Sequence, residues 1–205
     1  MKVSIGLSAP RAFLLVVTAI AIVHLDGDAR IAAKSPAKGT AEPTVTTKQA
    51  APAIEQAPLP APVAEMRDAI LAAVKSGRVE DLRTPVEWNE IRPEAADRPV
   101  DDLIAYWKQV SGDGEGREIL AILGEIIDAG HTTVPLGKDI ENNRLYVWPA
   151  IAELPLDRLT PEQEVQLYRL VKPAEAKVMR ERKKWTWYRL VIGADGTWHA
   201  FQKSD

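Results

Sequence analysis

The fold is decided by a stretch near the C-terminus, residues 185–201, which reads WTWYRLVIGADGTWHAF. Two short apolar runs flank the sequence GADG, a pattern typical of two β-strands joined by a tight hairpin. A type I turn at Ala194 and Asp195 would leave Gly196 in the left-handed conformation, which glycine adopts without steric penalty. The stretch therefore predicts a C-terminal β-hairpin whose short loop contains a bulge.

The two faces of this hairpin differ in chemistry, because successive side chains of a strand point to opposite faces. With Ile192 opposite Trp198, one face is apolar and is expected to join the core: Tyr188, Leu190, Ile192, Trp198 and Ala200. In the same register Leu190 lies opposite Ala200, Val191 opposite His199 and Arg189 opposite Phe201. The other face then mixes aromatic rings with a cation and an imidazole: Trp187, Arg189, Val191, His199 and Phe201.

This mixed face supplies the candidate ligand-binding residues, to which Trp148 is added from an earlier predicted strand. The set is Trp187, Arg189, His199, Phe201 and Trp148. Their rings suit stacking on a sugar or a peptide. The alternative is that these aromatic residues belong to the core, as those of a small sheet usually do.

The chain before the hairpin predicts helices and one further pair of strands. Helical spacing or helix-start signals occur in residues 64–76, 102–110, 117–129, 160–171 and 173–184, and strand-like runs in 131–136 and 145–148. Residues 78–99 are expected to be irregular, because Pro85, Pro93 and Pro99 interrupt any long element. The order predicts an α+β fold, with several helices packed on a small antiparallel sheet that includes the C-terminal hairpin.

Several residues predict where these helices begin or end. Gly77 is a natural stop for the first helix, and the pair Asp101 and Asp102 can cap the second. Thr160 and Gln163 form a capping-box pattern with Pro161 between them. The segment SGDGEG, residues 111–116, lacks the spacing of a calcium loop or a phosphate-binding turn. It is expected to be an acidic connector in which Asp113 caps the next helix.

The N-terminus is typical of an export signal. Residues 12–25, AFLLVVTAIAIVHL, are uncharged and too short for a permanent span, which needs about 20 residues. We expect a signal peptide over 1–29 cleaved after Ala29 or after Ala33, with a retained membrane anchor as the alternative. Residues 30–63 contain six prolines and no aromatic residue, and predict a disordered tether. A single globular domain is expected over 64–205.

Composition excludes several classes of chemistry. The chain has no cysteine, so disulfides and thiolate catalysis are excluded. Residues 64–130 carry eight basic and fifteen acidic side chains, which argues against a nucleic-acid partner. No cofactor or metal site is predicted, and the membrane is expected to be contacted only through the signal.

No catalytic motif is present. The chain has three histidines and lacks the HExxH and GxSxG patterns, so no catalytic residue is assigned. His199 could still pair in space with Glu153 or Asp157 and act as a general base. A hydrogen-bonded, half-buried structural histidine is the simpler interpretation.

The stretches RLYVWPAIAELPLDRLTPEQEVQLYRLV, residues 144–171, and WTWYRLVIGADGTWHAF resemble the C-terminal half of a group of secreted, uncharacterised alphaproteobacterial proteins. Ala150 stands where that group usually has tyrosine, which removes one candidate aromatic ligand. The resemblance covers about the last 140 residues and implies a periplasmic setting. It carries no activity.

Two functions of different class follow as hypotheses. The first is an exported, non-catalytic binding module of the cell envelope, whose partner is an envelope polymer, a protein or a small ligand. The second is a carboxylate-based hydrolase, or a small-ligand pocket of the nuclear-transport-factor-like type. An enzyme should gather acidic groups with shifted pKa values in a concave site, whereas a binding module should expose an aromatic patch.

Overall fold

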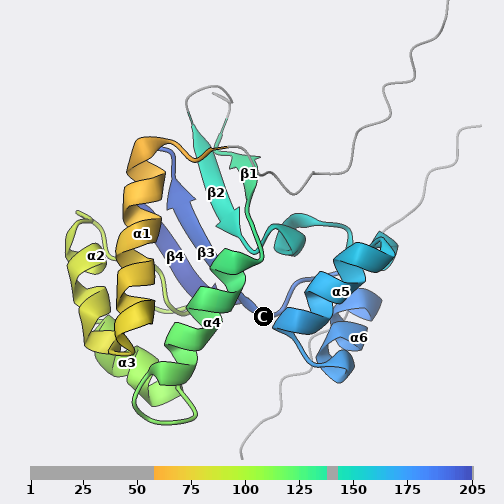
Figure 1. The fold of residues 1–205 in the computed structure, drawn as a ribbon, viewed down its shortest axis with the longest axis horizontal. Coiled ribbons are helices and arrows are strands. Elements are labelled where there is room, and N and C mark those ends of the chain that lie inside the picture. Colours follow the sequence, from red (N-terminus) through yellow and green to blue (C-terminus); the bar gives the residue numbers. More distant parts are fainter. Residues whose placement is uncertain (1–57, 138–142, 205) are drawn as a thin grey trace, which may run out of the picture. The chain divides into compact units, whose positions relative to one another are not determined.

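The computed structural model describes residues 58–137 and 143–204, all within one compact unit, residues 47–205. The chain forms a four-stranded antiparallel sheet in the order β1-β2-β3-β4. Its strands are β1 (Thr132–Pro135), β2 (Arg144–Trp148), β3 (Tyr188–Gly193) and β4 (Trp198–Lys203). The two predicted strand pairs are confirmed, and they join through β2 and β3 (Figure 1).

Six α-helices and three short 3₁₀ helices are found among the described residues. They are α1 (Ala61–Ser76), η1 (Val79–Leu82), α2 (Arg83–Glu87), α3 (Leu103–Val110), α4 (Arg117–Asp128), η2 (Ala150–Glu153), η3 (Leu156–Arg158), α5 (Pro161–Leu170) and α6 (Pro173–Arg182). In Figure 1, α1 and α4 lie over one face of the sheet, and α5 and α6 form a separate pair beside α4. The predicted α+β class is confirmed.

The core fills the space between the sheet and the helices α1, α3 and α4. The helix α4 places Leu123 and Ile126 there, fully buried, as its apolar periodicity predicts. The aromatic centre of the core joins α3 to β4: the ring of Trp107 stacks on Trp198 at 5.7 Å between centroids and lies 6.0 Å from Phe201. Such pairs contribute about 0.5–1.5 kcal/mol each beyond their burial.

A second apolar cluster holds α5 and α6 together. Leu167 of α5 and Met179 of α6 are buried against Trp185, which precedes β3. The Trp185 Nε1 donates a hydrogen bond to the Tyr188 carbonyl oxygen at 3.2 Å. This cluster fixes the entry of the chain into the C-terminal hairpin.

The predicted helix ends are confirmed by their hydrogen bonds. Gly77 ends α1 with φ of 69°, and the Asp102 carboxylate accepts the Ala105 N–H at 3.0 Å. Thr160 and Gln163 exchange both bonds of a capping box. Asp113 accepts the N–H groups of Gly116 and Arg117 at 3.1 and 3.3 Å, at the start of α4. Local signals therefore set these boundaries.

Two expectations about element boundaries are corrected. The helix α1 begins at Ala61 rather than Ala64, because Pro62 fits in a first helical turn and Val63 is fully buried. Residues 79–87 are not irregular but form η1 and α2, and Pro85 lies near the start of α2 where its missing N–H breaks no helical bond. Beyond Glu87 the segment is irregular, as expected.

The predicted register of the hairpin is wrong after its first pair. Ile192 lies opposite Trp198 as predicted, but a bulge then places Val191 opposite Ala200 and Leu190 opposite Phe201. His199 is the extra residue. Because a shift of one residue exchanges the two faces of a strand, Phe201 joins the helix-covered core and Ala200 moves to the opposite face.

The predicted signal peptide over 1–29 and nearly all of the predicted tether over 30–63 lie outside the described residues. Among the residues that the structure describes, no helix is long and apolar enough to cross a membrane.

Candidate functional site

The five residues of the sequence-based site do not come together on one open surface. Phe201 is 0% exposed and Trp148 is 1% exposed, so both are core residues. The bulge explains Phe201, and Trp148 lies on the same core face of the sheet. Trp187 and Arg189 are half-buried, and His199 alone is exposed.

Trp187 and Arg189 are engaged within the chain. The Lys203 ammonium lies over the Trp187 ring, 4.9 Å from its centroid. The Arg189 guanidinium pairs with Glu153 at 3.5 Å, which also removes Glu153 as a free partner for His199. Asp157, the other carboxylate expected near His199, pairs with Lys183 at 2.8 Å. Trp187 and Arg189 of the predicted mixed face therefore already have partners within the chain, although Arg189 Nε is buried without a hydrogen bond among the described residues.

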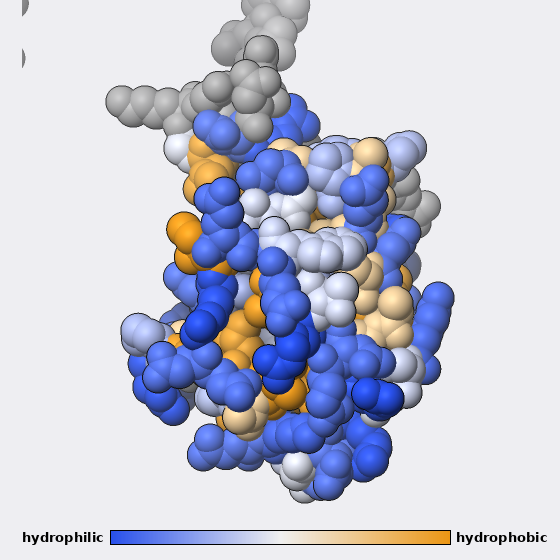
Figure 2. All heavy atoms as spheres, turned by 90° about the vertical axis from the view of Figure 1, so that its left-hand side faces the viewer, coloured by the Kyte–Doolittle hydropathy of each residue, from blue (hydrophilic) through white to orange (hydrophobic). Residues whose placement is uncertain are grey.

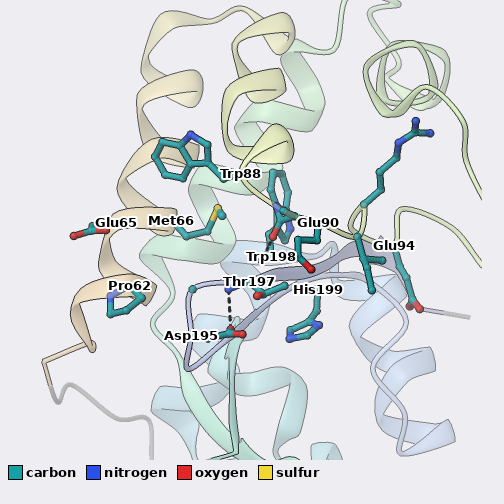
Figure 3. A pocket seen from close by; sticks show the side chains of 14 residues that line it. Pro62, Glu65, Met66, Trp88, Glu90, Glu94, Asp195, Thr197, Trp198 and His199 are labelled. Atoms are coloured by element: carbon teal, nitrogen blue, oxygen red, sulfur yellow. Dashed lines mark hydrogen bonds between the residues drawn. The ribbon is translucent and has the colours of Figure 1, made fainter.

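A concave site lies instead at the turn of the C-terminal hairpin. This cavity, here called the turn pocket, has a volume of about 630 Å³. It is lined by the first turns of α1, by residues 88–94 after α2, here called the pocket loop, and by residues 195–199. Figure 3 shows Trp88 lying across the pocket from Asp195 and His199. Three segments far apart in sequence thus build one site.

The hairpin turn is held against α1 by its glycine. Gly196 has φ of 88°, and its N–H donates to the Gly193 carbonyl at 2.9 Å, which confirms the predicted type I turn with a left-handed glycine. A Cβ at Gly196 would lie 2.8 Å from the Pro62 backbone oxygen. Only glycine therefore allows the turn to lie this close to the start of α1.

The pocket loop is fixed to strand β4 by three hydrogen bonds. The Asn89 side-chain oxygen accepts the Trp198 N–H at 2.7 Å. The Glu94 N–H donates to the His199 carbonyl, and the Phe201 N–H donates to the Glu94 carbonyl, each at 2.8 Å. The loop therefore extends the sheet edge at β4, and its side chains stand on a backbone that the sheet holds in place.

The side chains of Asp195 and His199 both lie close to Gly193. A Cβ at Gly193 would lie 2.7 Å from Asp195 Oδ1 and 2.8 Å from His199 Nε2, so a glycine there keeps room for both side chains. The Thr197 N–H donates to Asp195 Oδ1 at 2.9 Å. That hydrogen bond, with a smaller contribution from the charge of His199, holds the pKa of Asp195 below its usual value. Asp195 is therefore ionised at neutral pH.

The lining of the turn pocket carries more negative than positive charge. Its carboxylates are Glu65, Glu90, Glu94 and Asp195, and its basic side chains are Arg92 and His199. The Arg92 guanidinium donates a hydrogen bond to the Asp101 carbonyl at 2.6 Å and keeps its positive charge, but the four carboxylates outnumber it. Within the described residues, Glu65, Glu90 and Glu94 make no ion pair and no side-chain hydrogen bond.

The pocket loop also exposes two large apolar side chains. Trp88 is 57% exposed and Ile91 is 79% exposed, whereas Trp107, Trp148, Trp185 and Trp198 are buried. Figure 2 shows the face carrying α1 and α2, where apolar side chains lie in short strips between hydrophilic ones. Single exposed apolar residues are ordinary, but two of them beside a pocket indicate a surface for contact.

The pocket loop is not predicted by any sequence pattern. Residues 88–94 lack any periodicity, and their neighbours in space are residues of α1 and the hairpin turn. One signal was available: the tryptophan and isoleucine at 88 and 91 lie between prolines 85 and 93 in a segment with no apolar period to explain them. Large apolar residues without a helical or strand period are candidates for surface contact.

The described residues offer no group of three or more His, Asp or Glu side chains able to hold a metal ion. No protein-family model, curated protein or solved structure matches the chain. The turn pocket is therefore interpreted from its own geometry and charge.

Proposed function

We propose that the chain is an exported protein of the cell envelope that acts by binding rather than by catalysis, with the turn pocket as its binding site. One observation carries the proposal: a cavity of about 630 Å³ beside two exposed apolar side chains, Trp88 and Ile91. Ligand pockets typically enclose about 300–1,000 Å³ and are lined by apolar side chains with a few placed polar groups. Envelope polymers, proteins and small ligands are the partner classes.

Binding is favoured over carboxylate hydrolysis by the state of the acidic groups. A general acid needs a carboxyl whose pKa is raised towards neutrality. Asp195, by contrast, has a lowered pKa because it accepts a backbone hydrogen bond. The face of the sheet beneath the helices is filled by Trp107, Trp198 and Phe201, which leaves no room there for a pocket of the nuclear-transport-factor-like type.

The binding site is tested by titrating the purified full chain with peptides, saccharides and acyl compounds while tryptophan fluorescence is recorded. Since Trp88 is the most exposed described tryptophan, a bound ligand should shift its emission, and Trp88→Phe should remove that shift. A ligand that binds equally well to wild type and Trp88→Ala would place the site elsewhere.

Export rests on the N-terminal pattern and on the resemblance to secreted proteins. It is tested by fractionating cells that express the full gene and sequencing the N-terminus of the product. A soluble periplasmic chain beginning after residue 29 or 33 supports the cleaved signal. A membrane-bound chain that retains its N-terminus would indicate the anchor instead.

A further inference from the structure

The exposed aromatic face of Trp88 can be compared with another tryptophan of the same chain. The ring of Trp187 has the Lys203 ammonium over it, 4.9 Å from the centroid. Tryptophan is the aromatic side chain that binds cations best. Trp88 is 57% exposed and has no cation over its ring among the described residues. The Trp88 ring at the turn pocket is thus an exposed aromatic surface on which a cation from a ligand can bind.

The charge around the pocket favours the same kind of ligand. Glu65, Glu90 and Glu94 lack an ionic partner in the part of the chain that the structure describes. The Asp195 carboxylate is ionised, so the carboxylates of the lining outnumber the Arg92 guanidinium. An anionic ligand would be repelled by this rim, whereas a cation would be attracted.

The rim is also partly preorganised. Glu94 stands on backbone that is hydrogen bonded to β4 on both sides, and Asn89 binds the Trp198 N–H just before Glu90. In Figure 3, Glu90 lies between Trp88 and His199, so aromatic ring and carboxylate line the same space. Groups that are already held in place lose less entropy when a ligand binds.

Together with the proposed function, on which this inference rests, these observations identify a ligand class. We propose that the turn pocket binds an extended peptide segment carrying lysine or arginine. The aliphatic stem of the basic side chain lies along Ile91, its cation lies over Trp88, and Glu90 and Glu94 neutralise its charge. Such side chains combine an apolar stem with a charged head, as this lining requires.

The test uses the purified full chain and three short peptides of matched length, in which alanine alternates with lysine, with Nζ-acetyl-lysine or with glutamate. Isothermal titration gives each dissociation constant, and tryptophan emission is recorded in parallel. The lysine peptide should bind, more weakly at high salt because exposed charges are screened. Acetylation should weaken binding strongly, since it removes the charge and keeps most of the stem.

Variants of the pocket separate the two contributions. Glu90→Gln combined with Glu94→Gln should weaken lysine-peptide binding about five- to twentyfold. Trp88→Leu, which keeps an apolar surface without the ring, should weaken it about two- to thirtyfold. Glu115→Gln, an exposed carboxylate in the connector before α4, is the matched control and should change nothing. Urea unfolding of each variant checks that the fold is kept.

Three results would overturn the inference in distinguishable ways. If the acetylated or acidic peptide bound as tightly as the lysine peptide, with loss of binding in Trp88→Leu, the pocket would remain a binding site but not for cations. If the lysine peptide bound equally to wild type and to the double glutamine variant, Glu90 and Glu94 would not be its partners and the proposed cation site would be wrong. If no peptide, saccharide or acyl compound bound at all, the proposed function itself would fail.

Discussion

The aromatic core and the turn pocket both contain tryptophan, but the core tryptophans are buried and Trp88 at the pocket is exposed. In the core, Trp198 is fully buried, stacks on Trp107 and donates its Nε1–H to the Ala200 carbonyl at 3.1 Å. At the pocket, Trp88 is largely exposed. The Trp198 ring is buried in the core, whereas the Trp88 ring is exposed and can contact a partner.

Carboxylates divide in the same way. Asp113 at the start of α4 accepts hydrogen bonds from the Ser111 hydroxyl and from three backbone N–H groups. These bonds lower its pKa to about 2. Glu90 in the pocket loop has no such partner among the described residues. Amino-acid composition does not distinguish a structural carboxylate such as Asp113 from a free one such as Glu90. Only their hydrogen-bond and ionic partners in the structure distinguish them.

The largest loss of stability should come from removing the core tryptophan, Trp198. Trp198→Ala removes a fully buried ring beneath α3, and should lower the free energy of unfolding by about 3–5 kcal/mol, as large-to-small core changes do. Trp88→Ala is the matched control and should cost less than about 0.5 kcal/mol. Urea unfolding followed by circular dichroism measures both. Similar losses in the two variants would mean that Trp88 is a structural residue.

A smaller loss is expected where the core and the pocket are joined. Asn89→Ala leaves the Trp198 N–H without its acceptor, and should cost about 1–3 kcal/mol because that group is partly buried. Asn89→Asp keeps an acceptor at the same position and should recover part of the loss. Equal stability of wild type and Asn89→Ala would show that the pocket loop is not held to β4 through this side chain.

The turn glycine allows a controlled comparison of backbone strain with close contact. Gly196→Ala and Gly77→Ala both place alanine at positive φ, which costs about 1–2 kcal/mol. At Gly196 the new Cβ also meets the Pro62 backbone, whereas at Gly77 nothing lies within 4 Å. Gly196→Ala should therefore be the less stable variant in thermal unfolding. Equal melting temperatures would show that α1 and the turn separate without cost.

The smallest effect concerns the carboxylates and appears as a pH dependence. Because the pKa of folded Asp113 is lowered from 3.8 to about 2, its contribution to stability is present above pH 3.8 and is lost as the pH falls to about 2. Asp113→Asn should reduce stability at neutral pH and flatten this acid decline. Glu90→Gln should leave stability at neutral pH unchanged, because the Glu90 side chain has no hydrogen-bond or ionic partner among the described residues. Urea midpoints measured from pH 2 to pH 7 test both expectations.

Much of the fold was predictable because its signals are local. Thr160 with Gln163, Asp102, Gly77 and the GADG turn each act within a few residues, and each behaves as expected. The apolar period of residues 117–128 likewise predicted the central helix. The register of the hairpin was not predictable beyond Ile192, because the bulge at His199 places Phe201 against Trp107, a residue distant along the chain.

The candidate site was predicted only in part. His199 was named from the sequence and does line the turn pocket, but Phe201 and Trp148 are core residues and Trp187 is covered by Lys203. Trp88, Ile91, Glu90 and Glu94 were not named. Their value as a site depends on α1 and the hairpin turn lying opposite them, and no short-range pattern records that arrangement.

The sequence by itself determined the α+β class, most helix ends, the strand pairs and the glycine at the tip of the hairpin. These features follow from steric and hydrogen-bonding preferences within a few residues. The tertiary structure decided which aromatic rings are buried, which charges are paired and where a cavity forms. Those outcomes depend on contacts between segments distant along the chain, such as Asn89 with Trp198 and Gly196 with Pro62, because burial and pairing are properties of the packed molecule.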